Sequence, residues 1–330
     1  MKDNVLNLGI IGTGSIASAM ASTVNQMEDV KLYAVASRTE KNAVTFAKKY
    51  DAQVAYGSYA ELAADENVDL VYIATPHSEH FENAKLCLEN GRNVLCEKAF
   101  TINASQAKEL VELARKKELF LSEAMWTRYQ PLAIKLKELL EDNSIGHVTM
   151  VSSNMHFPMM GKERLWNPKL AGGALLDVGI YPLTISSIVM GDDIEEVVAR
   201  GKITELSMDE SAAAIITYKN GKIAVTSWGM SASSDCKATI YGSGGMLVVS
   251  GVNRIEKIEQ FDTNWNCVKT YEADESELTG YECEVKACKE AIMNGEKETK
   301  VMPWEKTIFM MDLMDEIRHQ IGVKYPQENN

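Results

Sequence analysis

Two polar side chains interrupt an apolar stretch in the second half of the chain. Asp177 and Tyr181 occur in the segment Gly172-Gly-Ala-Leu-Leu-Asp-Val-Gly-Ile-Tyr181, where we expect a largely apolar helix to begin near Ala174. Residues four apart share one face of a helix. Burying a carboxylate and a phenol there is costly unless they are hydrogen-bonded. The pair therefore either serves a functional site or forms a mutual hydrogen bond that only stabilises the core.

A second chemical signal stands at the start of the chain. Gly12, Gly14 and Ala17 follow the apolar run Val5 to Ile11 at the spacing of a dinucleotide fingerprint, in which a buried strand turns directly into a helix. Such a turn holds a pyrophosphate with backbone N–H groups and the positive end of the helix dipole. Glycine-rich turns also occur where nothing binds, so the context must decide. The predicted phosphate-binding residues are Gly12, Thr13, Gly14, Ser15 and Ile16.

The residues after the second predicted strand, Lys31 to Ser37, bear on which dinucleotide would bind. An NAD enzyme usually has a carboxylate here for the ribose 2′-hydroxyl, whereas this chain has Ser37-Arg38-Thr39. A guanidinium pairs with a phosphate, which an acidic side chain would repel. The sequence thus favours NADP(H) over NAD(H), unless Arg38 is only a solvated cation of a surface loop.

The first 122 residues alternate between predicted strands and helices, which indicates a parallel sheet with helices on both faces. Ligands of such sheets bind at the carboxyl ends of the strands. Two predicted strand ends carry polar side chains, and their candidate cofactor contacts are Thr75, Pro76, His77, His80, Glu97 and Lys98. A histidine at a helix start is about as often a cap as a ligand contact. Lys98 could orient a substrate hydroxyl or favour ionisation of a nearby acid, but a lysine taken alone is more often a surface charge.

The composition restricts the class of protein. The chain has 330 residues and a formal net charge of −13, from 47 acidic and 34 basic side chains, and we find no basic patch. A nucleic acid or an anionic membrane would therefore be repelled. No signal-like segment opens the chain and no apolar run of membrane-spanning length is evident, so we expect a cytoplasmic protein. The six cysteines lack C-x-x-C spacing, and we expect no disulfide and no metal site.

We expect a domain boundary after Ser122, between residues 1–122 and 123–330. Beyond it, the alternation of strands and helices gives way to successive strands. Asn220-Gly221 separates two strand-like runs, a strong hairpin signal. Further strands are expected at His147 to Phe157, Lys237 to Tyr241, Met246 to Ser250 and Ile255 to Phe261. An antiparallel sheet of this kind can leave one face free for a partner subunit. Two helices, Gly280 to Asn294 and Pro303 to Ile321, should close the second domain.

These motifs together resemble the glucose-fructose oxidoreductase and inositol dehydrogenase family, also called Gfo/Idh/MocA. The resemblance spans nearly the whole chain and rests mainly on Glu97-Lys98, on Glu123-Ala-Met-Trp-Thr-Arg128 and on the segment from Gly172 to Tyr181. Within the family, the chain is most similar to the dihydrodiol dehydrogenase and NADP-dependent D-xylose 1-dehydrogenase subgroup.

The resemblance implies an α/β fold: an N-terminal Rossmann domain with a parallel sheet, and a C-terminal α+β domain with a largely antiparallel open sheet that forms a homodimer or homotetramer. It identifies Lys98 with the lysine of the family's Glu-Lys-Pro motif, with Ala99 in place of the proline. It also implies that Trp126 and Arg128 contact the cofactor, as Ser37 and Arg38 do.

The implied activity is hydride transfer between NADP(H) and a sugar, polyol or cyclic diol. Tyr181 would be the general acid or base, with Lys98 and Asp177 assisting, because a free phenol titrates near pH 10 and needs help to act at neutral pH. The candidate substrate contacts, His156, Arg164, Asp177 and Tyr181, cannot distinguish xylose from a dihydrodiol, nor oxidation from carbonyl reduction. The alternative is a protein that is not an enzyme: a catalytically silent sensor or scaffold that binds NADPH.

Overall fold

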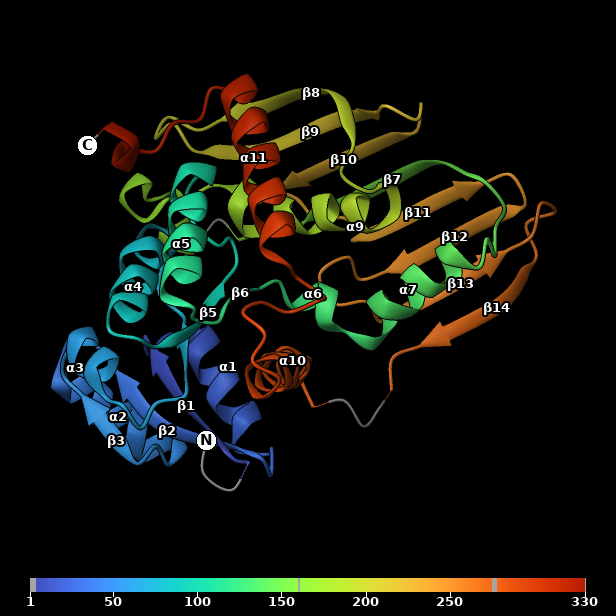
Figure 1. Cartoon of the computed structure of the whole chain (residues 1–330). Helices are drawn as coiled ribbons and strands as arrows, with labels where there is room; N and C mark the ends of the chain where they lie inside the picture. Colours follow the sequence, from blue (N-terminus) through green and yellow to red (C-terminus); the bar gives the residue numbers. More distant parts are fainter. Residues whose placement is uncertain (1–3, 160, 275–277, 330) are drawn as a thin grey trace. The chain divides into compact units, whose positions relative to one another are not determined.

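The computed structural model describes residues 4–159, 161–274 and 278–329. The chain forms two compact units (Figure 1). The first consists of Met1–Met125 and Leu278–Ile308, and the second of Trp126–Glu277 and Phe309–Asn330. The predicted division into 1–122 and 123–330 was therefore wrong in one respect, because a C-terminal segment returns to the first unit.

A six-stranded parallel sheet forms the centre of the first unit, with the strand order β3-β2-β1-β4-β5-β6. This is the order of a dinucleotide-binding Rossmann sheet, whose ligand crevice lies where the order reverses, between β1 and β4. The strands are β1 (Leu6–Ile11), β2 (Val30–Ala36), β3 (Val54–Tyr56), β4 (Leu70–Ile73), β5 (Asn93–Glu97) and β6 (Leu121–Ala124). The helices are α1 (Ser15–Val24), α2 (Glu40–Tyr50), α3 (Tyr59–Ala64), α4 (His77–Glu89), α5 (Ala104–Lys117) and α10 (Tyr281–Met293).

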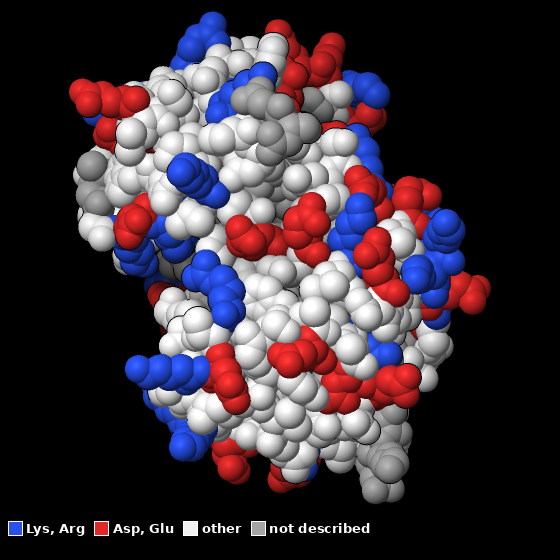
Figure 2. Space-filling view, turned by 90° about the vertical axis from the view of Figure 1, so that its left-hand side faces the viewer, with Lys and Arg blue, Asp and Glu red and all other residues white. Residues whose placement is uncertain are grey.

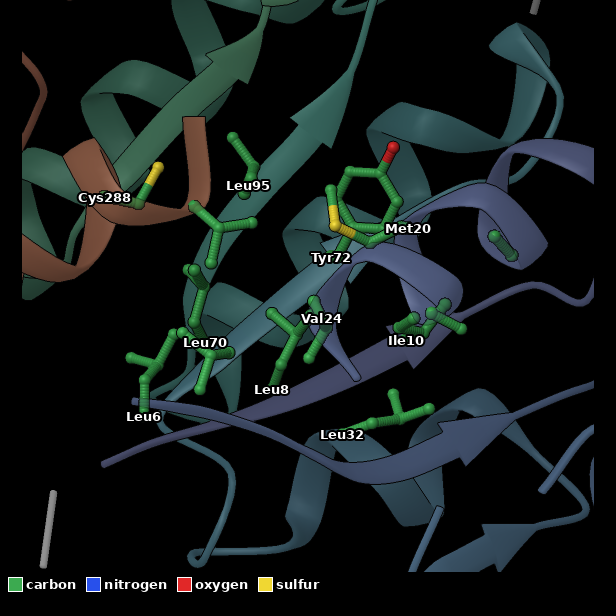
Figure 3. Packing of buried hydrophobic residues seen from close by; sticks show 14 of the residues in the cluster. Leu6, Leu8, Ile10, Met20, Val24, Leu32, Leu70, Tyr72, Leu95 and Cys288 are labelled. Atoms are coloured by element: carbon green, nitrogen blue, oxygen red, sulfur yellow. The ribbon is translucent and has the colours of Figure 1, made fainter. Parts of the chain in front are cut away.

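The core of this unit explains why α10 belongs to it. Leu6, Leu8 and Ile10 of β1 pack with Met20 and Val24 of α1 in one buried cluster (Figure 3). The apolar face of α10 joins the same cluster through Val285, Cys288 and Ala291. A fully buried aliphatic side chain contributes about 1.5–3 kcal/mol, so the returning helix stabilises the first unit although it lies far along the sequence.

The second unit is built on an eight-stranded sheet with the order β14-β13-β12-β11-β7-β10-β9-β8. Its pairs are antiparallel except for β7 with β10, which are parallel. The strands are β7 (Val148–His156), β8 (Ile194–Ile203), β9 (Asp209–Tyr218), β10 (Ile223–Gly229), β11 (Lys237–Gly242), β12 (Gly245–Ser250), β13 (Lys257–Phe261) and β14 (Cys267–Glu272). The predicted α/β plus largely antiparallel α+β architecture is confirmed.

Helices cover one face of this sheet. The π-helix η2 (Leu175–Gly179) continues into α9 (Ile180–Met190), which packs against β7 and β10. The other helical elements are α6 (Trp126–Tyr129), α7 (Pro131–Glu141), α8 (Glu163–Trp166), η1 (Pro168–Leu170), η3 (Pro326–Asn329) and α11 (Trp304–Ile321), of which the part from Phe309 onward belongs to this unit.

One stretch, Pro168–Met190, is long and apolar enough by length and composition alone to cross a membrane, although we expected none. In the described structure 94% of its apolar window is buried inside the protein. Its apolar character is therefore explained by its place as the core helix of the second unit.

Candidate active site

The turn between β1 and α1 has the shape of a phosphate cradle. Gly12 has φ +107°, and a Cβ built there would lie 2.6 Å from the carbonyl oxygen of Ala74, so no side chain fits. A Cβ on Gly14 would meet no atom within 4 Å. The second glycine thus borders open space. The space and the turn fit a dinucleotide pyrophosphate, which needs close approach to the backbone.

The first turn of α1 supplies donors to this space. Gly14 is the N-cap residue, and Ser15 and Ile16 behind it are exposed. The first N–H groups of a helix have no partner within the helix, and the helix dipole favours an anion at this end. Thr13, which precedes the cap, is half-buried. The predicted phosphate segment therefore presents backbone donors and no acidic side chain.

The end of β2 also fits the predicted ribose site. Ser37 is 6% exposed and donates its backbone N–H to the carbonyl oxygen of Tyr56 at 3.2 Å. Arg38 is exposed next to it, and Thr39 caps α2 by accepting from the N–H of Asn42. A buried serine and an exposed arginine thus stand where the fold reads the 2′ position.

The polar residues after β4 are tied together by His80. This fully buried imidazole contacts two backbone carbonyl oxygens, that of Thr75 through Nε2 and that of Ala99 through Nδ1, each at 2.9 Å. Burial lowers its pKa, since the charged form would lose its hydration. With both nitrogens engaged, His80 connects the ends of β4 and β5, whereas His77 and Pro76 begin α4 beside it.

Glu97 and Lys98 lie at the end of β5. The Glu97 carboxylate accepts a hydrogen bond from the hydroxyl of the buried Tyr72, and its Oε2 accepts from the Lys98 N–H at 3.2 Å. The Lys98–Ala99 peptide bond is cis. In the next residues, the Phe100 N–H donates to Glu123 Oε1 at 3.2 Å. Two buried carboxylates therefore fix the backbone on both sides of Lys98.

Sequence reasoning missed a third acid in this region. Glu284 of α10 is fully buried, and neither of its carboxylate oxygens has a hydrogen-bond partner among the described residues. Burial raises its pKa well above the usual range, and the nearby Glu97 and Glu282 raise it further. The sequence does hold one indication of this acid: Glu284 lies on the same face of α10 as the apolar residues Val285 and Cys288.

The second unit brings Asp177 and Arg164 together. Asp177 is 6% exposed, and its Oδ1 lies 2.8 Å from the Arg164 guanidinium, which comes from α8. Tyr181 follows in the first turn of α9 and is 8% exposed. A carboxylate and a phenol are thus held on one helix, with a cation paired to the carboxylate.

Three glycines of the same segment allow close packing around these residues. A Cβ on Gly172 would lie 2.5 Å from the Leu165 carbonyl oxygen, and one on Gly179 would lie 2.9 Å from the Trp228 ring. Gly173 has φ +112°, and its Cβ would lie 2.3 Å from Oδ1 of Asp209. Small residues are therefore required by the packing of the helix start, not only by local flexibility.

Asp209 is the second residue that sequence reasoning missed. Its Oδ2 accepts from the Leu175 N–H at 2.7 Å and from the Trp228 indole N–H at 3.3 Å. It is fully buried, and burial raises its pKa to about 6 in spite of these hydrogen bonds. Nothing in its sequence context, Met-Asp-Glu-Ser at the start of a strand, distinguishes it from a surface acid.

His156 lies on the opposite side of the sheet from Asp177 and Tyr181. Side chains alternate along β7: Ser153 donates to the Pro182 carbonyl oxygen of α9 at 3.1 Å, while His156 contacts the Ser227 hydroxyl at 3.1 Å. With Ser227, it lines a cavity of about 470 Å³. The structure therefore does not bring His156 to the predicted substrate residues.

Trp126 and Arg128 occupy α6, at the start of the second unit. The Arg128 guanidinium donates to the Ser187 hydroxyl of α9 at 2.8 Å, and the adjacent Thr127 hydroxyl donates to the Asn253 carbonyl oxygen at 2.5 Å. Arg128 is thus attached to the helix that carries Tyr181. Among the described residues, no group of three or more His, Cys, Asp or Glu side chains could hold a metal ion.

The sequence also matches known proteins over its length. Residues 6–125 match the oxidoreductase family with the NAD-binding Rossmann fold, GFO_IDH_MocA, and residues 133–248 match the GFO/IDH/MocA C-terminal domain. The chain is 36% identical to D-xylose 1-dehydrogenase (NADP(+)) of Hypocrea jecorina, covering 98% of this chain and 93% of that protein. It is 32% identical to trans-1,2-dihydrobenzene-1,2-diol dehydrogenase of Xenopus laevis, covering 96% and 98%.

Solved structures share the fold. KijD10, a 3-ketoreductase from Actinomadura kijaniata in complex with NADP and TDP-benzene, superposes with a TM-score of 0.87 at 23% identity, covering 96% of this chain and 98% of that one. An aldose-aldose oxidoreductase from Caulobacter crescentus superposes with a TM-score of 0.86 at 19% identity, covering 99% and 98%. With both of its domains matched, the chain belongs to the GFO/IDH/MocA oxidoreductase family.

Proposed function

We propose that the protein is an NADP(H)-dependent oxidoreductase acting on a sugar, a polyol or a cyclic trans-diol. The observation that carries the proposal is the phosphate cradle of the first unit, with its open space at Gly14 and the exposed Arg38 at the ribose end. The names of the similar D-xylose and dihydrodiol dehydrogenases support the substrate class and, for the former, the cofactor.

Each group of residues has a defined part in this proposal. The turn from Gly12 to Ile16 binds the pyrophosphate, while Ser37 and Arg38 bind the 2′-phosphate. A nicotinamide held there would supply hydride acceptance from a substrate carbinol carbon, and hydride donation to a carbonyl carbon in the reverse direction. Thr75 and His77, at the end of β4, line the same carboxyl edge of the sheet, where this fold binds its ligands.

Tyr181 takes the hydroxyl proton of the substrate during oxidation and returns it during reduction. The phenol must ionise for this, and we propose that the positive charge of Lys98 favours its ionised form. Asp177, held by Arg164, accepts a hydrogen bond from a second substrate hydroxyl and orients it. These roles would account for a carboxylate and a phenol on an apolar helix.

The test is an absorbance assay at 340 nm with a panel of aldoses, polyols and trans-diols and with both coenzymes. We expect turnover with NADP⁺, and we expect Tyr181→Phe to lower kcat by about 10²- to 10⁴-fold while NADPH affinity stays within about twofold. A variant with full turnover on every substrate would reject the role of Tyr181. Coenzyme binding without turnover across the panel would favour the sensor or scaffold.

We also propose that the protein forms a homo-oligomer through the open face of the eight-stranded sheet. A row of side chains in register crosses this face, opposite the helices. Its members from β8 to β12 are uncharged: Val198, Ile215, Val225, Ser152, Thr239 and Val248. The next member, on β13, is Glu259. Val198 and Ile215 are 43% and 50% exposed. Depletion of charge at the centre of a surface is typical of protein interfaces.

A further inference from the structure

We propose that Asp209 is a positioning residue whose ionised carboxylate holds the helix start that carries Asp177 and Tyr181, so that protonation of Asp209 lowers turnover. The inference rests on the proposed function of those two residues. In this proposal Asp209, at the first position of β9, does not itself contact substrate or cofactor. It acts through the backbone of η2.

The geometry ties Asp209 to that helix at its first residue. Oδ2 receives the Leu175 N–H at 2.7 Å, and Asp177 follows two residues later. An anion at a helix N-terminus complements the free N–H groups and the dipole of the helix. A hydrogen bond to an ionised acceptor is roughly twice as strong as one to a neutral acceptor. The charge of Asp209 therefore determines how firmly the first turn is held.

Two neighbours lie close to the carboxylate. A Cβ built on Gly173 would lie 2.3 Å from Oδ1, and the Trp228 indole N–H donates to Oδ2 at 3.3 Å. Oδ1 has no hydrogen-bond partner among the described residues. A proton on Oδ1 thus breaks no hydrogen bond that the structure shows, but it removes the charge that strengthens the bond to Leu175.

The groups around Asp209 do not neutralise it. From η2 comes Asp177, an acid whose charge is paired with Arg164. The C-terminal tail contributes Tyr325, which is fully buried and whose own pKa is raised by burial and by the charge of Asp209. The Trp228 side chain from β10 carries no charge.

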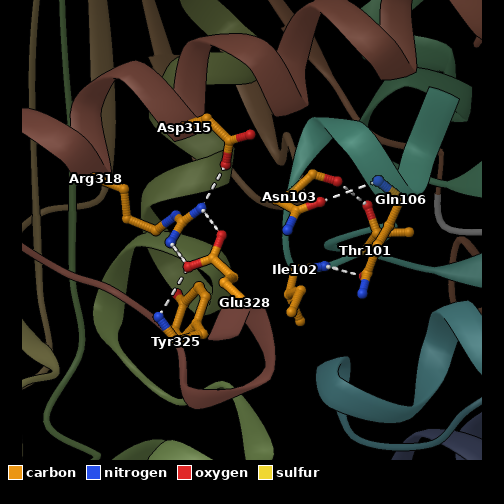
Figure 4. A network of polar contacts seen from close by, with 8 residues as sticks. All are labelled: Thr101, Ile102, Asn103, Gln106, Asp315, Arg318, Tyr325 and Glu328. Atoms are coloured by element: carbon orange, nitrogen blue, oxygen red, sulfur yellow. Dashed lines mark hydrogen bonds and ion pairs between the residues drawn. The ribbon is translucent and has the colours of Figure 1, made fainter. Parts of the chain in front are cut away.

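Arg318, a cation in contact with Tyr325, is itself paired with two carboxylates (Figure 4). Arg318 of α11 lies 4.7 Å from the Tyr325 ring centre and binds Asp315 at 2.7 Å and both oxygens of Glu328 at 2.7 and 2.8 Å. With its charge balanced by two carboxylates, it compensates Asp209 little. Burial therefore dominates and raises the pKa of Asp209 to about 6, within reach of physiological pH.

The activity test compares wild type with Asp209→Asn, which keeps an oxygen for Leu175 but is neutral at every pH. We expect kcat of the wild type to fall about fivefold below an inflection near pH 6. D209N should have the low value at pH 8 and no inflection, with KM for NADP⁺ unchanged. Asp193→Asn, which changes an exposed acid paired with Lys219, should behave as wild type. An unchanged inflection in D209N would overturn the inference.

A second readout does not depend on turnover. Because the Trp228 indole donates to Asp209, tryptophan fluorescence should titrate near pH 6 in the wild type and not in D209N. If no substrate is turned over but this titration is present, the proposed function fails while the ionisation of Asp209 stands. If turnover is normal and the titration is absent, the inference fails alone.

Discussion

At the scale of single residues, Gly12 and Gly14 show that two glycines of one motif serve different purposes. Gly12 is required by the protein itself, because its φ is positive and a backbone carbonyl occupies the Cβ position. Gly14 has a φ of −81° and open space around it, so no contact among the described residues requires a glycine there.

Alanine substitutions at the two glycines should therefore have opposite consequences. Gly12→Ala should lower the free energy of unfolding by about 1–3 kcal/mol through strain and the clash with Ala74. Gly14→Ala should leave stability within about 0.5 kcal/mol but weaken NADPH binding, because the methyl group occupies pyrophosphate space. Urea denaturation and a fluorescence titration with NADPH measure the two effects. Equal NADPH affinity for G14A and wild type would show that the space at Gly14 is not the phosphate site.

Arg38 tests the choice of coenzyme. Arg38→Ala should raise KM for NADP⁺ by about 10- to 100-fold, the loss expected for a charged hydrogen bond to a phosphate, and leave KM for NAD⁺ unchanged. Initial rates with each coenzyme measure this. Lys41→Ala removes a neighbouring exposed cation on α2 and is the control for a general loss of positive charge. If K41A and R38A shift the two constants equally, Arg38 is only a solvated loop cation.

At the scale of secondary-structure elements, α10 combines a structural part with a buried acid. The helix completes the core of the first unit, yet it places Glu284 in the interior near Glu97 and Glu282. Tyr72 of β4 and Cys288 are further titratable groups near Glu284. An acid whose pKa is raised by folding destabilises the folded state once the pH exceeds its pKa in the unfolded chain.

The pH dependence of stability measures this effect of Glu284. Below about pH 4, where Glu284 is protonated in both states, Glu284→Gln should match wild type. As the pH rises, wild type should lose stability relative to E284Q, by about 1 kcal/mol or more at pH 8. Glu290→Gln, at an exposed position of the same helix, is the matched control. A difference between E284Q and wild type that does not change with pH would contradict the buried, protonated state.

The elements also show what could be read from the sequence. Alternating strands and helices predicted the Rossmann sheet because each βαβ unit is local. The return of α10 was missed because an amphipathic helix does not reveal which core it joins. Strands β8 and β14 were missed as well, because most residues of both strands are exposed and β8 carries several charged side chains. The parallel pairing of β7 with β10 depends on contacts between distant segments.

The candidate site follows the same pattern. Asp177, Tyr181 and Lys98 were conspicuous because their residue types contrast with apolar surroundings. Asp209 and Glu284 were not, because an acid in a polar local context becomes unusual only when the tertiary structure buries it. His156 was predicted as a polar loop residue that contacts substrate, but it lies on β7, and strand alternation points it to the face opposite α9.

At the scale of the whole molecule, charge does not favour an anionic coenzyme. The formal net charge is −13, and on the face shown in Figure 2 acidic and basic side chains are interspersed. Long-range attraction of a phosphorylated dinucleotide is therefore weak or repulsive. Its affinity must come from local groups, which are the start of α1 and Arg38.

The same net charge makes self-association depend on a neutral surface, which the open sheet face offers. Ile215→Asp places a carboxylate in the uncharged row, where burying it against a partner leaves it unpaired. We expect I215D to weaken self-association by about 30-fold or more, with the free energy of unfolding of the dissociated chain little changed. Ile134→Asp, at a position on α7 that is 46% exposed, should associate as wild type. Light scattering coupled to size-exclusion chromatography over a concentration series measures this, and equal oligomer mass for I215D and wild type at every concentration would place the interface elsewhere.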